Sequence, residues 1–369
     1  MEHNLKIIFT IWKYGFFPTL SNNKRKHEFL PENTKLWSVG IPLMYFIILF
    51  IAFWKQTHEM IEVDYVIVQR YAVIKVIIMM LLLCTVHFKK HEIPSVLAEI
   101  RRLREILLVY GVHRNLDQVK KCVLALSVIL LLFRVCWVSG DIYMTFRNAL
   151  PIANTVSGIT CDILIDYQFL LFYFYLLYVI WNYYNEFASN IQKNLNNILT
   201  QSDLEKVMYI RKKFTSTFNK LLNVFEAAIL LKYTYDFISI VFCLYLQIYV
   251  EDNADFDVFV VNCMVQALWF IWLVLSNVIF LYFNVEIRNK SKLIAEYIEI
   301  IQENIGSHRL SYRHMEKFLL NIQINDEQTV VCGLFSLDWP FFQLMIGGVT
   351  TSLIYLVQFR ELETEIETL

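Results

Sequence analysis

Long apolar runs alternate with polar segments along almost the whole chain. A bilayer core about 30 Å thick is crossed by a helix of roughly 20 mostly apolar residues. Seven runs are of this kind: Leu36–Trp54, Val66–Val86, Val123–Val138, Ile152–Trp181, Phe225–Tyr249, Phe256–Ile287 and Phe341–Phe359. The pattern therefore predicts an all-α membrane protein with seven transmembrane helices.

The segments between these runs differ sharply in basic residues. Those on one side of the predicted membrane, beginning with the N-terminus, hold 26 Lys and Arg, and those on the other side, ending with the C-terminus, hold 3. Cytoplasmic segments carry the excess of Lys and Arg, so we expect a cytoplasmic N-terminus and an extracellular C-terminus. G-protein-coupled receptors have the opposite orientation, which argues against that class.

The basic segments also carry apolar residues at helical spacing. We therefore expect the fourth to sixth spans to continue as helices beneath the membrane and to pack together there. The alternative is a set of separate amphipathic helices that lie at the lipid headgroups.

Composition supports a membrane protein and argues against several other classes. Hydrophobic residues make up 57% of the chain and charged residues only 18%, which is far more apolar than a soluble domain. A net charge of -1 gives no basic surface for nucleic acid. The scattered cysteines and histidines form no metal-ligand pattern, and no nucleophile or paired-carboxylate motif stands out. We expect no enzyme activity, no cofactor and no metal.

A transporter, the alternative membrane protein, would be expected to show internal repeats and broken helices, and neither is present.

The last apolar run carries polar and small residues on one face. Gly347, Thr351, Ile354 and Gln358 follow one another at i, i+4, i+7 and i+11, so they share a side of the helix. Small residues let helices approach closely, and hydroxyl and amide groups tolerate water. Isoleucine side chains from several facing helices would form a dry constriction. From the residues alone, this face either packs within its own bundle or lines a water path.

Two stretches near the C-terminus resemble sequences of a known family. Thr351–Phe359 reads TSLIYLVQF, and Gly333–Phe342 reads GLFSLDWPFF. They resemble the Thr-Tyr, five apolar residues, Gln-Phe signature of insect gustatory receptors and the Gly-Leu-Phe segment that precedes it. Ser352 stands where that family usually has tyrosine. The seven spans and the cytoplasmic N-terminus extend the resemblance over nearly the whole chain.

This resemblance implies a function and an assembly. Gustatory receptors and the related odorant receptors are tetrameric ligand-gated cation channels whose last helix lines the pore. The implied partners are a small-molecule tastant, permeating cations, membrane lipids, and further copies or related receptor subunits. The implied location is the plasma membrane of a sensory neuron. The pore and gate residues that the resemblance implies are Gly347, Thr351, Ile354, Tyr355, Gln358 and Phe359.

The same interpretation divides the chain into five parts. They are a cytoplasmic N-terminal segment at 1–35, six spans with their helical extensions and an outer ligand cavity at 36–287, a cytoplasmic anchor and pre-pore segment at 288–340, the pore helix at 341–359 and an extracellular acidic tail at 360–369.

Polar residues in the outer halves of the spans are the candidates for ligand binding. They are Arg70, Arg134, Asp166, Gln168, Tyr245, Gln266 and Trp269. The Gln266 amide and the Trp269 indole are three residues apart and share a side of the sixth span. An aromatic face beside a group that both donates and accepts suits a sugar. An apolar bitter compound is the alternative ligand, and an ordinary core aromatic is the alternative role for Trp269.

Charged residues inside the spans should face the bundle interior and be paired. Lys232 and Asp236 are four residues apart, so we expect them to form a structural ion pair. Asp162 and Asp166 share a face, and we expect Arg134 or Arg70 to neutralise them. Such a cluster would brace the bundle or contact the ligand.

Overall fold

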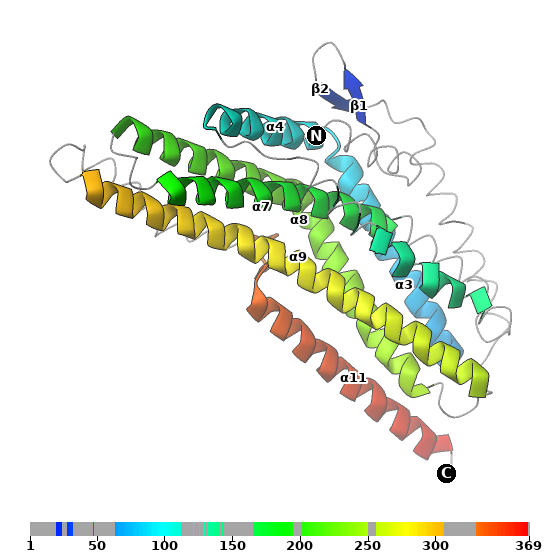
Figure 1. Cartoon of the computed structure of the whole chain (residues 1–369). Helices are drawn as coiled ribbons and strands as arrows, with labels where there is room; N and C mark the ends of the chain where they lie inside the picture. The colour runs from blue at the N-terminus through cyan, green and yellow to red at the C-terminus, as the bar shows by residue number, and fades with distance from the viewer. Residues whose placement is uncertain are drawn as a thin grey trace.

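The computed structural model describes residues 20–23, 28–31, 63–111, 165–194, 201–249, 256–305 and 330–367, together with Ile47 and parts of the segment 121–143. Its helices are α3 (Val63–Phe88), α4 (Ile93–Val109), α7 (Gln168–Asn194), α8 (Gln201–Tyr249), α9 (Phe256–Ile305) and α11 (Trp339–Glu367). Two short antiparallel hairpins join β1 (Leu20–Asn23) to β2 (Glu28–Pro31), and β3 (Val330–Val331) to β4 (Phe335–Ser336). The described chain is thus almost entirely helical (Figure 1).

The predicted spans correspond to helices wherever the structure describes them. The runs at 66–86 and 152–181 overlap α3 and α7, and those at 225–249 and 256–287 lie within α8 and α9. The run at 123–138 is helical at its described positions, whereas the run at 36–54 lies outside the described residues except for Ile47. Among the described helices, α8, α9 and α11 are long and apolar enough to cross a membrane.

Helices α8 and α9 are much longer than a bilayer requires. They contain 49 and 50 residues, so each passes without a break from its predicted span into the adjoining basic segment. Helix α7 likewise continues past its span to Asn194. These extensions lie side by side, with α4 packed on α8 (Figure 1). The predicted continuation of the spans as packed helices is therefore confirmed.

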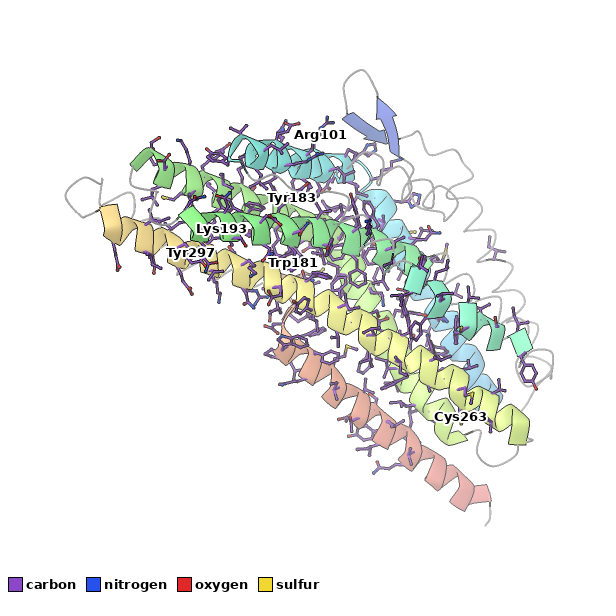
Figure 2. The ribbon with its side chains drawn as sticks, viewed as in Figure 1. Arg101, Trp181, Tyr183, Lys193, Cys263 and Tyr297 are labelled. Atoms are coloured by element: carbon purple, nitrogen blue, oxygen red, sulfur yellow. The ribbon has the colours of Figure 1, made fainter. Side chains whose placement is uncertain are left out.

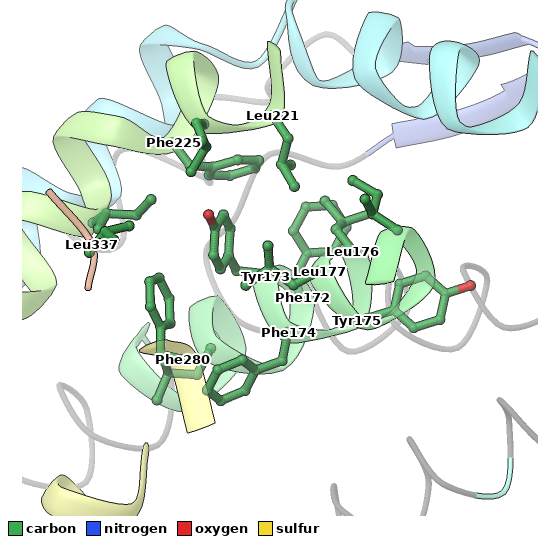
Figure 3. Close-up of a cluster of buried hydrophobic side chains, with 14 of the residues drawn as sticks. Phe172, Tyr173, Phe174, Tyr175, Leu176, Leu177, Leu221, Phe225, Phe280 and Leu337 are labelled. Carbon is green, nitrogen blue, oxygen red and sulfur yellow. The ribbon is translucent and has the colours of Figure 1, made fainter. Parts of the chain in front are cut away.

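An aromatic core holds α7, α8 and α9 together. Every described residue from Ile165 to Leu177 is buried, because α7 has neighbours on all sides. The Tyr173 ring stacks on Phe280 of α9 with centroids 4.8 Å apart, and it meets Phe225 of α8 edge-on at 5.5 Å (Figure 3). Side chains fill the space between these helices along most of their length (Figure 2).

A glycine sets how closely the helical segment just after the third predicted span approaches α9. A Cβ atom added to Gly140 would lie 2.1 Å from Cγ2 of Val265, far inside van der Waals contact. We predict that Gly140→Ala lowers the free energy of unfolding by about 1–3 kcal/mol, because the packed helices must move apart. Thermal unfolding of the purified protein measures the loss. Adding Val265→Ala should restore part of it; a double variant less stable than Gly140→Ala would contradict this explanation.

Candidate functional site

A short hairpin and a helix cap position the start of α11. Cys332 and Gly333 both have positive φ, 50° and 70°, and the Leu334 N–H donates to the Val331 carbonyl at 2.9 Å. Glycine adopts this backbone conformation without strain. The Asp338 carboxylate then accepts hydrogen bonds from the Phe341 N–H at 3.1 Å and from the Ser336 hydroxyl at 2.5 Å. A carboxylate is a favourable N-cap.

The first turn of α11 is fixed to the bundle by aromatic rings. Phe341 stacks on Phe335 with centroids 4.1 Å apart, and the edge of Tyr233 on α8 meets both rings at 5.0 and 6.0 Å. The Arg288 guanidinium of α9 donates to the Leu337 carbonyl at 3.0 Å. We call Tyr233, Phe335, Phe341 and the Arg288–Leu337 hydrogen bond the α11 junction. It connects the last helix to both long helices.

Beyond this junction, α11 packs against the described bundle along one face. Of its most apolar 18-residue window, 11% is buried, against 50% in α8 and in α9. Met345 and Val349 are buried, and a Cβ on Gly348 would lie 3.1 Å from the Phe237 ring of α8. Gly348, and not Gly347, is thus the glycine that lets α11 approach its neighbour.

The opposite face of α11 carries the residues that were predicted from the sequence to share one side of this helix. Gly347, Thr351, Ile354 and Gln358 are all exposed, and helical geometry puts them about half a turn from Met345 and Val349. Gln343 and Thr350 are also exposed on this side. We call these six residues the polar stripe.

The polar stripe is exposed at all six positions in the described part of the chain. A Cβ on Gly347 would meet no atom within 4 Å. The Thr350 and Thr351 hydroxyls donate to the carbonyls of Ile346 and Gly347, one turn back in the same helix. Tyr355 and Phe359, at 58% and 65% exposed, flank the stripe. The sequence prediction did not include Gln343. This residue lies four positions before Gly347 and so extends the polar stripe by one helical turn.

A second cluster surrounds Gln266 and Trp269 of α9, which are both buried. The Trp269 ring stacks on Trp137 with centroids 5.9 Å apart. The Cys243 thiol of α8 donates to Gln266 Oε1 at 3.1 Å. The predicted pair thus faces inward, toward α8 and the third span.

The Lys75 ammonium of α3 lies among the rings of this cluster. Its Nζ is 5.3 Å from the centroid of Trp269, 5.5 Å from that of Trp137 and 5.8 Å from that of Tyr235. Such distances are typical of cation–π contacts. We call Lys75, Trp137, Tyr235 and Trp269 the aromatic cage. Sequence reasoning did not include Lys75 in the site, although a charge within a span was the signal for it.

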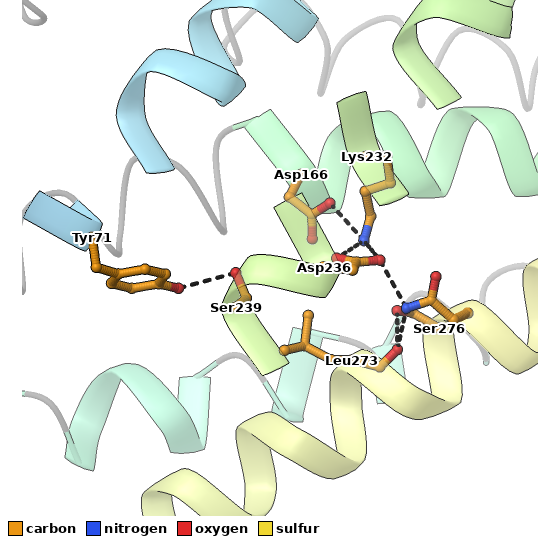
Figure 4. Close-up of polar contacts among 8 residues, drawn as sticks. Tyr71, Asp166, Lys232, Asp236, Ser239, Leu273 and Ser276 are labelled. Carbon is orange, nitrogen blue, oxygen red and sulfur yellow. Dashed lines mark hydrogen bonds and ion pairs between the residues drawn. The ribbon is translucent and has the colours of Figure 1, made fainter. Parts of the chain in front are cut away.

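Tyr71 joins α3 to α8 beside the cage. Its ring lies 3.6 Å from that of Phe242, and its hydroxyl donates to Ser239 at 3.0 Å (Figure 4). The ring of Tyr71 also meets Trp269 at 6.5 Å.

An ion-pair cluster lies deeper in the bundle. Lys232 contacts the carboxylates of Asp236 and Asp166, the latter at 3.3 Å, and the Asn277 amide donates to Asp236 at 2.8 Å (Figure 4). The predicted Lys232–Asp236 pair is confirmed. The structure gives Asp166 a partner that the sequence did not predict, Lys232, while the side chains of the two predicted arginines lie outside the described residues. That lysine is 66 positions away along the chain, beyond the reach of any periodicity argument.

Three of the seven predicted ligand residues lie in these two clusters. Gln266 and Trp269 belong to the cage region, and Asp166 belongs to the ion-pair cluster. Gln168 and Tyr245 are buried on α7 and α8. The side chains of Arg70, Arg134 and Asp162 lie outside the described residues. The Tyr235 ring, 5.8 Å from the Lys75 ammonium and 5.8 Å from that of Lys232, links the clusters.

The sequence and the fold were compared with those of known proteins. Residues 5–363 match the sequence model of a family described as 7tm chemosensory receptor. The fold is similar to that of the insect olfactory receptor OR5 from Machilis hrabei, with a TM-score of 0.69 and 11% identity over 96% of this chain and 97% of that one. The same receptor in complex with eugenol gives the same values. No curated protein matches the chain. The predicted all-α fold with seven transmembrane helices is thereby confirmed.

Proposed function

The chain belongs to the 7tm chemosensory receptor family, and from this premise we propose that it is a gustatory receptor that is itself a cation channel. In this proposal four copies surround one axis in the plasma membrane of a sensory neuron, α11 of each copy lines the pore, and a tastant opens it. The observation that carries the proposal is the polar stripe, which is exposed in the single chain on a helix apolar enough to cross a membrane.

Lipid is a poor neighbour for the polar stripe. The amides of Gln343 and Gln358 have no hydrogen-bond partners in hydrocarbon, and burying an unsatisfied amide is costly. Facing copies of α11 would instead enclose water, with rings of Thr351 and Gln358 as polar lining and Ile354 as a dry constriction. Gln358 and Phe359 form the proposed gate.

The proposed ligand site is the region of Gln266 and Trp269. It is buried, aromatic and formed by four helices, as sites for small molecules commonly are. A tastant that binds the open arrangement more tightly shifts the population toward it. The fold's similarity to a receptor solved with eugenol supports a small molecule as the ligand. Sugars remain the first class to test and bitter compounds the second.

Cysteine accessibility tests the pore. We predict that Thr351→Cys and Gln358→Cys channels lose most of their current, about 10-fold or more, when a positively charged thiol reagent binds in a narrow pore. Currents are recorded from expressing cells after screening sucrose, caffeine and quinine for calcium entry. Val349→Cys, on the face that packs against α8, is the matched control and should keep its current. The unmodified chain corrects for the native cysteines.

Oligomer size provides the independent check. The receptor in lipid nanodiscs should have the mass of four 44.0 kDa chains. The proposed pore would be contradicted if the protein were a monomer in nanodiscs. It would also be contradicted if the thiol reagent blocked the Val349→Cys and Gln358→Cys channels equally.

A further inference from the structure

Two adjacent threonines at the middle of the polar stripe have already used their hydroxyl protons. The Thr350 hydroxyl donates to the Ile346 carbonyl at 3.0 Å, and the Thr351 hydroxyl donates to the Gly347 carbonyl at 2.9 Å. A hydroxyl has one proton to donate and two lone pairs that accept. What each oxygen has left for a neighbour is therefore its acceptor capacity, and both side chains are exposed.

A glycine keeps the Thr351 oxygen open to its surroundings. Side chains of a helix lean toward the preceding turn, and the residue beside Thr351 in that turn is Gly347. A Cβ atom at Gly347 would meet no atom within 4 Å, so this part of the stripe is not covered. Thr350 and Thr351 lie about 100° apart around the helix axis. Together they present two oxygens to the proposed water path.

The rest of the same wall offers no charge. From Trp339 to Phe359 the sequence contains no Asp, Glu, Lys, Arg or His. The amides of Gln343 and Gln358 each contain donors and an acceptor, so they suit an anion as well as a cation. Ion selection along this segment must therefore come from dipoles. Of the exposed polar side chains on the stripe, the two threonines are those that offer oxygen without a matching donor.

We propose that Thr350 and Thr351 form the element of the pore that selects cations against anions. This inference rests on the proposed function, because it needs four α11 helices around one water path. In that arrangement the hydroxyl oxygens of the four copies form a double ring of acceptors, which can replace part of the hydration shell of a cation such as Na⁺ or K⁺. A chloride ion needs donors, and those of both threonines are held by the helix backbone.

Valine variants test the pair, because valine keeps the branched shape of threonine and removes the oxygen. The current is evoked with whichever of sucrose, caffeine and quinine is active in the calcium screen. Its reversal potential in unequal NaCl solutions gives the permeability ratio of Na⁺ to Cl⁻, which does not depend on the number of channels. Thr350→Val combined with Thr351→Val should lower this ratio about 10-fold or more, because polar contacts to charged groups are the stronger ones. Each single variant should lower it by less.

Conservative variants separate the oxygen from the packing of the side chain. Thr350→Ser and Thr351→Ser keep the hydroxyl and should keep the ratio. Thr234→Val is the matched control outside α11: Thr234 of α8 is exposed, and its hydroxyl donates to the Leu230 carbonyl at 2.9 Å. It removes the same group from the same backbone contact and should change nothing. If the double valine variant reaches the surface but does not conduct, the single variants decide. A serine variant that lowers the ratio as much as its valine counterpart contradicts the inference.

The acidic residues after Phe359 are the other source from which cation selection could come. Glu361 and Glu363 belong to this segment, and carboxylates at a pore mouth raise the local cation concentration. A ratio that falls with Glu361→Gln and Glu363→Gln, and not with the valine pair, overturns the inference while the pore stands.

The thiol reagent separates this inference from the proposed function. If the Gln358→Cys channel is blocked and the double valine variant keeps its ratio, the threonine element is wrong and the pore is not. If sucrose, caffeine and quinine all evoke no current, the threonine element and the proposed channel are both overturned.

Discussion

Lys232→Met is expected to lower the free energy of unfolding by about 3–5 kcal/mol, the usual cost of breaking a buried ion pair by removing one partner. Lys232 contacts both Asp166 and Asp236, and each carboxylate is fully buried. Without the ammonium, two like charges would remain together in a low-dielectric interior. The measurements are thermal unfolding of the purified protein and the fraction that reaches the cell surface, which should fall steeply.

Compensating variants distinguish lost charge balance from lost packing. Lys232→Met combined with Asp166→Asn and Asp236→Asn removes all three charges and should recover much of the stability, because neutral replacements of a buried ion cluster are often tolerated. Asp236→Asn alone should cost less than Lys232→Met, since Lys232 keeps Asp166 as a partner. Should the triple variant be as unstable as Lys232→Met, lost side-chain packing and not charge would be the cause.

The ion-pair cluster also shows what the sequence could and could not predict. Lys232 and Asp236 lie one helical turn apart, so periodicity alone predicted their contact. Asp166 belongs to another helix, and periodicity places a residue on a face without saying which element covers that face. The same limit applies to the cage. Helical spacing placed Gln266 and Trp269 on one side of a single helix, but their partners, the thiol of Cys243 and the ammonium of Lys75, come from α8 and α3.

The last helix was the most predictable element, because its polar period is strong and local. The shared face of Gly347, Thr351, Ile354 and Gln358 is confirmed as exposed. Its ends were less predictable. The segment taken as an acidic tail is helical through Glu367, which is reasonable since no glycine or proline interrupts it. The acidic residues that follow Phe359 thus continue α11 as far as Glu367.

The second large effect concerns transmission of the ligand signal to α11. Past its first turn, α11 touches the described bundle along a single face, so the α11 junction is its firmest attachment. Phe341→Ala is expected to remove most of the ligand-evoked current, about 10-fold or more, while the receptor still folds. Truncating a packed phenylalanine costs about 3–5 kcal/mol, and that loss falls here on the attachment of one helix. The measurement is maximal current normalised to the amount of receptor at the surface, with the tastant found in the screen.

The neighbouring Phe342→Ala is the matched control. Its side chain is also packed against the core, but the ring that it meets is Trp339 of the same helix, edge-on at 6.4 Å, whereas Phe341 meets Phe335 and Tyr233. Its truncation should therefore leave more of the current than Phe341→Ala does. Tyr233→Ala should reproduce the Phe341→Ala defect, and the double variant should be little worse than either, because both changes break one attachment. Additive losses would mean that the two rings act independently and that ligand-driven movement reaches α11 through its contact with Phe237 instead. In the proposed channel, a ligand bound among α3, α8 and α9 opens the pore only through contacts that move α11 with these helices, and the α11 junction supplies such contacts.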